Sequence, residues 1–147
     1  MKQGGGDFGG RLHHEVPSWV EPGAVFHIRI RCRTENSPPL TDAKLAAALL
    51  DSVRFYQARQ VWHATAFLLM PDHLHALLSF PRDKSMSRVI GEWKHFHAVK
   101  NGVRWQENYF DHRLRGVDQI EFKHQYILNN PVAKGYCERP EEWPWKL

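Results

Sequence analysis

Hydrophobic and polar residues alternate along residues 25–33, VFHIRIRCR. In an extended chain the apolar residues would all point to one side and the basic residues to the other. A period of two with β-branched residues is typical of a half-buried strand, so we predict a strand here. The apolar side comprises Phe26, Ile28, Ile30 and Cys32, and the basic side comprises His27, Arg29, Arg31 and Arg33.

The patterns that follow predict three helices and three more strands. The helices are expected over residues 43–59, from Ser85 or Ser87 to residue 101, and from residue 119 to about 130, with Thr41 or Asp42 capping the first and Asp118 the last. The strands are expected over residues 62–69, from the MPDH turn to residue 80, and over residues 105–115. This order predicts an α+β fold, a ferredoxin-like βαββαβ antiparallel sheet followed by a C-terminal helix. That fold hosts many functions, so it does not decide the activity.

Composition narrows the class of protein only slightly. The 147 residues, 42% of them hydrophobic, fit one domain with a core. We expect a flexible glycine-rich tail over residues 1–22 and a single domain over residues 23–147. Cys32 and Cys137 form no CxxC motif, and no apolar run approaches the roughly 20 residues of a membrane span, so we expect reduced thiols in a cytoplasmic protein without a membrane partner. A net charge of +4 permits a nucleic-acid partner and equally a slightly cationic surface.

Two histidines flank one leucine in LLMPDHLHALLSF. In a strand His73 and His75 would project side by side from one face, which suits two imidazoles that grip one ion. Two ligands do not make a tight site, so a third group must come from elsewhere. In a chain with ten histidines, two that merely share a strand face remain the simpler interpretation of the pair alone.

Tyr126 and Asn130 lie four residues apart in the last predicted helix and would share one helical face. They could be a tyrosine at the edge of the core and a helix terminator before Pro131. Alternatively, Tyr126 is a nucleophile, a metal held by the two histidines polarises a phosphate, and Asn130 supplies a third ligand. Taken together, these residues suggest a phosphodiester-cleaving site with a covalent tyrosyl intermediate.

Three segments, LMPDHLHALL, WQENYFDHRLR and QYILNNPVAKGYCERPEEWPW, follow in this order and spacing. They resemble the REP-associated tyrosine transposases, single-tyrosine transposases of the HUH nuclease superfamily, from about Pro22 to Trp145. The resemblance implies that His73 and His75 bind a divalent metal, Mg²⁺ or Mn²⁺, and that Asn130 completes the metal site. It also implies that Tyr126 attacks single-stranded DNA, which leaves a 5′-phosphotyrosyl link and a free 3′-OH.

The resemblance further implies hairpin-forming palindromic DNA as the substrate of a metal-dependent transposase. The expected setting is the bacterial cytoplasm, in association with the nucleoid, and the protein would act as a monomer or a homodimer. Residues 11–14 could reach a DNA groove. Candidates for phosphate contact, each of which could equally be surface charge, are Arg29, Arg31, Arg33, Lys94, Arg113 and Arg115.

Two other functions remain open. The chain could be a non-catalytic regulator, derived from a transposase, that binds hairpin DNA. It could also hydrolyse small phosphoesters with water as the nucleophile, although this leaves the spacing of Tyr126 and Asn130 unexplained.

Overall fold

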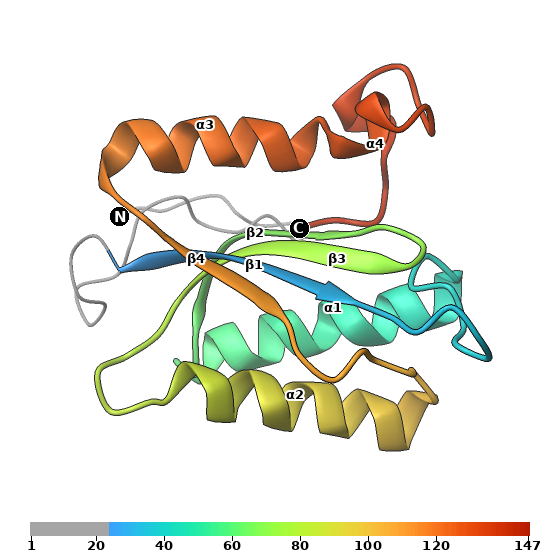
Figure 1. Ribbon diagram of the computed structural model, residues 1–147, viewed down its shortest axis with the longest axis horizontal. Helices are drawn as coiled ribbons and strands as arrows, with labels where there is room; N and C mark the ends of the chain where they lie inside the picture. Colours follow the sequence, from blue (N-terminus) through green and yellow to red (C-terminus); the bar gives the residue numbers. More distant parts are fainter. Residues whose placement is uncertain (1–23) are drawn as a thin grey trace.

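The computed structural model describes residues 24–147, which form a four-stranded antiparallel sheet with helices on both faces (Figure 1). The strand order β2-β3-β1-β4 confirms the predicted α+β, ferredoxin-like plan. The predicted flexible tail lies outside the described residues. In chain order the elements are β1 (Val25–Arg31), α1 (Ala43–Ala58), β2 (His63–Leu69), β3 (His73–Ser79), α2 (Met86–Asn101), β4 (Phe110–Leu114), α3 (Gly116–Leu128), α4 (Asn130–Ala133) and a 3₁₀ turn, Pro140–Glu142.

The two faces of the sheet carry different layers. Helices α1 and α2 cover one face and α3 runs across the other (Figure 1). The predicted alternation of β1 is confirmed, because Ile28 and Ile30 lie in the large core that includes Trp62 and Trp93. A smaller apolar cluster, which includes Ile127 of α3, lies on the opposite face. The arginines of β1 and the histidines of β3 that lie opposite them are on this second face.

Side chains near the helix ends explain where α1 and α2 begin and end. The Asp42 carboxylate accepts a hydrogen bond from the Leu45 N–H at 3.1 Å, and the Ser85 hydroxyl accepts one from the Arg88 N–H at 3.3 Å. These two caps were among those predicted, and each satisfies a backbone donor that has no partner within the helix. Gly102 ends α2 with φ of 73°, a conformation that glycine adopts without strain.

The strand predicted over residues 105–115 is too long, because β4 begins only at Phe110. The Lys94 amine donates to the carbonyls of Gln106 and Glu107, at 2.9 and 3.2 Å. The Trp105 indole donates to the Lys94 carbonyl at 2.9 Å. These contacts with α2 hold the segment before β4 in an irregular conformation. The local strand pattern could not predict this, because the contacts come from another element.

The last long helix begins earlier than predicted, at Gly116, with Arg115 at its N-cap position. The Gln119 side chain accepts a hydrogen bond from the Arg115 N–H at 2.7 Å. Asp118 therefore lies in the first helical turn, where its charge complements the helix dipole, and does not serve as the predicted cap. Within residues 24–147, no helix has the length and apolar character needed to cross a bilayer.

The C-terminal residues lie along the outer edge of β2. The Leu69 N–H donates to the Trp145 carbonyl and the Leu147 N–H donates to the Phe67 carbonyl, both at 2.8 Å. The Trp143 indole also donates to the Leu69 carbonyl at 2.9 Å. Part of the proline- and tryptophan-rich end therefore continues the sheet, since its strand-like bonding satisfies backbone groups of β2.

A buried polar network joins α1 to α2. The Ser52 hydroxyl donates to the Leu49 carbonyl at 2.7 Å, and the Trp93 indole donates to the Ser52 oxygen at 2.8 Å. The second lone pair of that oxygen then accepts from His97 Nε2, also at 2.8 Å. His97 Nδ1 accepts from the Asn101 amide at 2.8 Å. This pattern requires a neutral imidazole, and burial lowers the pKa of His97 to about 4.

We expect acid to destabilise the fold through His97. In the unfolded chain His97 takes up a proton near its ordinary pKa of 6.5, whereas in the folded protein it does so only near 4. The contribution to stability is therefore complete above pH 6.5 and falls as the pH drops to 4, by up to about 3 kcal/mol. Chemical denaturation across this pH range should give a flatter profile for His97→Gln than for the wild type.

The exposed His95 on the same helix supplies a matched control. His95→Gln should retain the wild-type profile. An unchanged pH slope in His97→Gln would contradict the role of the buried network.

Candidate functional site

The pairing of β1 with β3 places the two predicted metal-binding histidines beside two arginines. Arg29 lies opposite His75 and Arg31 lies opposite His73 in this antiparallel pair. Residues directly opposite each other project from the same face of a sheet. Both histidines are buried, and their ring centroids are 5.0 Å apart. The predicted side-by-side arrangement of His73 and His75 is thus present, on the face that α3 crosses.

Each of these histidines is held through its Nδ1 atom. His73 Nδ1 lies 2.8 Å from the Asp72 carboxylate, and His75 Nδ1 lies 3.0 Å from Nε2 of the buried His27. Because a carboxylate can only accept, neutral His73 carries its proton on Nδ1 and keeps a lone pair on Nε2. If His75 likewise donates to His27, its Nε2 has the lone pair that a metal ligand needs.

Sequence reasoning missed His27 and assigned Asp72 only to a turn. His27 belongs to the basic side of the alternating strand, so the pattern had placed it on the correct face. Its imidazole stacks on that of His75, with centroids 5.2 Å apart and planes inclined by 18°. Only the pairing of β1 with β3 reveals this contact, because the two residues are 48 positions apart.

Burial keeps these imidazoles neutral. It is the largest cause of the lowered pKa values of His27, about 4, and His75, about 3, and nearby cationic residues lower both further. Burial also lowers the pKa of His73, although the Asp72 carboxylate opposes that change. The neutral form is the one that binds metal, so these histidines need not release a proton at neutral pH to bind an ion.

Tyr126 reaches the histidines from α3. Its ring centroid lies 6.2 Å from that of His75 in an edge-to-face arrangement, and 47% of the residue is exposed. The Lys123 amine, one turn earlier, lies 4.6 Å from the centroid of the tyrosine ring. The phenol therefore stands between the buried imidazoles and solvent, where a bound strand could reach it.

The helix predicted to run to about residue 130 is present but ends slightly earlier, at Leu128, and Asn130 opens a separate short helix, α4. Pro131 has no N–H to donate to the Ile127 carbonyl, so the regular bonding of α3 cannot continue past this point. Asn130 is 6% exposed, and among residues 24–147 its side-chain oxygen has no hydrogen-bond partner.

An unpartnered buried oxygen is costly, and a metal ion is one group that would satisfy it. Among residues 24–147, no group of three or more His, Cys, Asp and Glu side chains is arranged to hold a metal. For a centre built on His73 and His75, a third protein ligand would have to be of another kind, and an amide oxygen such as that of Asn130 is chemically suitable. Two imidazoles and an amide oxygen make a donor set suited to Mn²⁺ and acceptable to Mg²⁺.

The predicted DNA contacts separate into two groups. Arg29 and Arg31 share the sheet face of His73 and His75. Arg113 pairs with Phe26 on β1 and so projects from the opposite face. All of these assignments to phosphate contact stay predictions, but only the first two arginines adjoin the histidines through strand pairing.

The other three candidates lie at the margins of this face or away from it. Arg115 is exposed at the start of α3. Arg33 is exposed and its Nε donates to the Trp105 carbonyl at 3.3 Å. Lys94 is buried, with its amine committed to two backbone carbonyls, and this arrangement does not favour its predicted contact with DNA.

Comparison with known proteins finds the same family that the motifs resemble. The family model described as "Transposase IS200 like" matches residues 24–130. A REP-associated tyrosine transposase from Escherichia coli strain K12 is 27% identical over 85 residues, which cover 54% of this chain and 50% of the relative. A relative from Haemophilus influenzae is 26% identical over 101 residues and matched over 57% of its length. The chain thus spans about half the length of these curated relatives.

A solved structure supports the fold. It is described as a REP-associated tyrosine transposase bound to a REP hairpin, and it superposes with a TM-score of 0.71 at 22% sequence identity. The match covers 90% of this chain and 81% of the other.

We expect His27 to strengthen metal binding without contacting the ion. His27→Phe removes the hydrogen-bond partner of His75 Nδ1 and should weaken Mn²⁺ binding by roughly 10- to 100-fold. His27→Gln offers an amide that can bond the same nitrogen and should retain most of the affinity. Mn²⁺ titration of the DNA-free proteins, followed by electron paramagnetic resonance, measures the difference. Equal affinity in wild type and His27→Phe would contradict this role.

We expect Asn130 to matter for the metal more than for the fold. Asn130→Leu removes an unpartnered buried oxygen, so the metal-free melting temperature should not fall. The rise in melting temperature on adding Mn²⁺ should be lost, because a ligand of the ion has been removed. Asn129→Leu, at the adjacent exposed asparagine, should keep that rise. If Asn130→Leu retains the full Mn²⁺-dependent rise, Asn130 is not a ligand.

Proposed function

This chain belongs to the IS200-like transposase family, and from this premise we propose that it cleaves and rejoins single-stranded DNA through Tyr126. The observation that carries the proposal is the approach of the Tyr126 ring to His75, with centroids 6.2 Å apart. The unpartnered oxygen of Asn130 gives further support. A half-exposed tyrosine with only a structural role would not need a buried, neutral histidine against its ring.

The chemistry is the transfer of a phosphodiester from DNA to the tyrosine. The Tyr126 hydroxyl oxygen attacks the phosphorus and loses its proton, a bond forms between oxygen and phosphorus, and the bond to the 3′ oxygen breaks. The 3′ oxygen takes up a proton and leaves as a free hydroxyl. Rejoining is the reverse reaction, in which a 3′-OH attacks the phosphotyrosine. The half-exposed position of Tyr126 suits both directions, since a strand must enter and leave.

The metal is part of the same proposal. His73, His75 and Asn130 would hold Mg²⁺ or Mn²⁺, which when bound would draw negative charge from the scissile phosphate. Asp72 and His27 would fix the orientation of the two imidazoles. These residues thus set where a phosphate must sit for Tyr126 to reach it.

Hairpin-forming DNA is the proposed substrate. The solved relative is described as bound to a REP hairpin, and we extend that class of DNA to this chain. Arg29 and Arg31 supply positive charge beside the histidines, where the strand would run. Because phosphate contacts release counterions, binding should weaken as salt increases.

We expect Tyr126→Phe to abolish a covalent protein–DNA adduct. Phenylalanine preserves the ring against His75 but lacks the attacking oxygen. A labelled hairpin with single-stranded flanks, incubated with Mn²⁺ and resolved under denaturing conditions, measures the adduct. Tyr136→Phe is the matched control, because Tyr136 is similarly exposed but lies against Trp143.

Two outcomes would overturn the proposal. One is an adduct that persists in Tyr126→Phe. The other is hairpin binding that survives chelation with no adduct in any metal, which would instead support a non-catalytic regulator. Turnover of small phosphoesters without an adduct would favour the hydrolase.

A further inference from the structure

A pocket of about 320 Å³ adjoins the candidate active site. It lies where the end of β1 meets the start of β4. Its lining combines two arginines, Arg29 and Arg31, with two aromatic residues, Tyr109 and Phe110, and with the polar segment 106–108. Residues 106–110 belong to the WQENYF stretch, whose role in catalysis or binding the proposed function leaves unassigned.

Strand pairing makes this pocket a neighbour of the histidines. On β1, Arg29 is paired with His75 on one side and with Phe110 on the other. The three residues therefore form one row across the sheet, on the same face. Phe110 also meets the edge of His27, with centroids 5.6 Å apart. A strand whose phosphate lies at the histidines would thus have its adjoining nucleotide beside this pocket.

The lining suits a nucleotide chemically. The Arg29 guanidinium lies 4.8 Å from the centroid of the Phe110 ring, so a charge for a phosphate and a surface for a base occur together. Phe110 is 42% exposed, which leaves ring surface available for stacking. Base–aromatic stacking is tolerant of sequence, and arginine contacts with phosphate are strong. The Glu107 carboxylate would repel a phosphate at its own side of the pocket but could accept from a base amino group.

The wall of the pocket is held in place from behind. The buried Lys94 amine donates to the carbonyls of Gln106 and Glu107, and the Gln106 N–H donates to the Arg31 carbonyl at 2.8 Å. Lys94 also lies 6.0 Å from the centroid of the Tyr109 ring. A loop tied to both α2 and β1 loses little entropy when a ligand binds, which favours binding.

We propose that this pocket binds one unpaired nucleotide next to the phosphate that Tyr126 attacks. The inference rests on the proposed function, since that function supplies the strand. The pocket has the volume of a small-ligand site, which suits one base and its sugar. A base inside a duplex is already stacked between its neighbours, so a base that stacks on the exposed ring of Phe110 belongs to the single-stranded flank, with its phosphate at Arg29 and Arg31.

An abasic scan of the DNA tests the proposal with the wild-type chain. The probe is a fluorescent hairpin with single-stranded flanks, titrated in chelator so that no cleavage occurs and followed by anisotropy. Removing the base at one flank position adjoining the cleavage site should weaken binding roughly tenfold, as expected for one lost stacking contact. Removing bases elsewhere in the flank should change binding less. Equal effects at every flank position would overturn the proposal.

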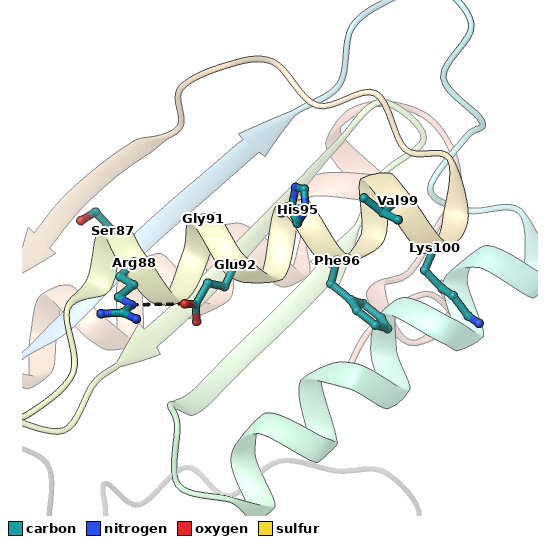
Figure 2. Close-up of a pocket in the computed structure, with 8 residues that line it drawn as sticks. All are labelled: Ser87, Arg88, Gly91, Glu92, His95, Phe96, Val99 and Lys100. Atoms are coloured by element: carbon teal, nitrogen blue, oxygen red, sulfur yellow. Dashed lines mark hydrogen bonds and ion pairs between the residues drawn. The ribbon is translucent and has the colours of Figure 1, made fainter.

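Variants then assign that base to Phe110. Phe110→Leu keeps an apolar contact with His27 but removes the stacking surface, and Phe110→Ala removes both. Each variant should bind DNA with the intact flank about tenfold more weakly than the wild type does. On DNA that lacks the critical base, variant and wild type should bind with nearly the same affinity. Phe96→Ala is the matched control, because Phe96 is similarly exposed on the outer face of α2 (Figure 2). If a Phe110 variant weakens binding by the same factor on the abasic DNA as on the intact DNA, the proposal is overturned.

The binding assay separates this inference from the proposed function, which the adduct assay tests. If one flank base proves critical but the wild type forms no adduct, the pocket stands and the cleavage proposal fails. If the adduct forms but no flank base is critical, cleavage stands and the pocket fails. Absence of hairpin binding under every condition would overturn both.

Discussion

The antiparallel register between β1 and β3 is the constraint on which the site depends. It sets Arg29 against His75 and Arg31 against His73, and it brings His27 within hydrogen-bond reach of His75. A slip of one residue would turn the imidazoles and guanidinium groups of the slipped strand into the apolar core on the other face. The register is therefore maintained by the hydrophobic effect, since the same slip would expose Ile28 and Ile30 on the polar face.

Around that register, the site combines neutral nitrogen donors with fixed positive charge. Burial and neighbouring cations lower the pKa of His75 to about 3, so its ring stays uncharged beside Arg29 and Arg31. The positive charge of the two arginines and the unprotonated nitrogens of the imidazoles therefore occur together on one surface. The helix break at Asn129, where α3 gives way to α4, lies between an exposed Tyr126 and a buried Asn130.

Much of this arrangement follows from local sequence patterns. The alternation of β1, the caps at Asp42 and Ser85, and the shared face of His73 and His75 all depend on residues close together in the chain. The features that were missed depend on distant partners. The start of β4 is delayed by Lys94 of α2, and the contact of His27 with His75 requires a strand pairing that no single segment encodes. The start of α3 was missed because its N-cap residue, Arg115, makes no side-chain cap hydrogen bond, so this end has none of the usual cap signals.

The C-terminal residues beside β2 have a consequence for self-association. An exposed edge strand offers unpaired N–H and carbonyl groups to another chain, and proteins commonly protect such edges. Here the backbone groups of Trp145 and Leu147 pair with the edge of β2, so a strand from another molecule cannot pair there. Growth of the sheet into a continuous ribbon of molecules needs two open edges, and this chain closes one of them. Edge-to-edge contact through β4 would therefore stop at a pair of molecules.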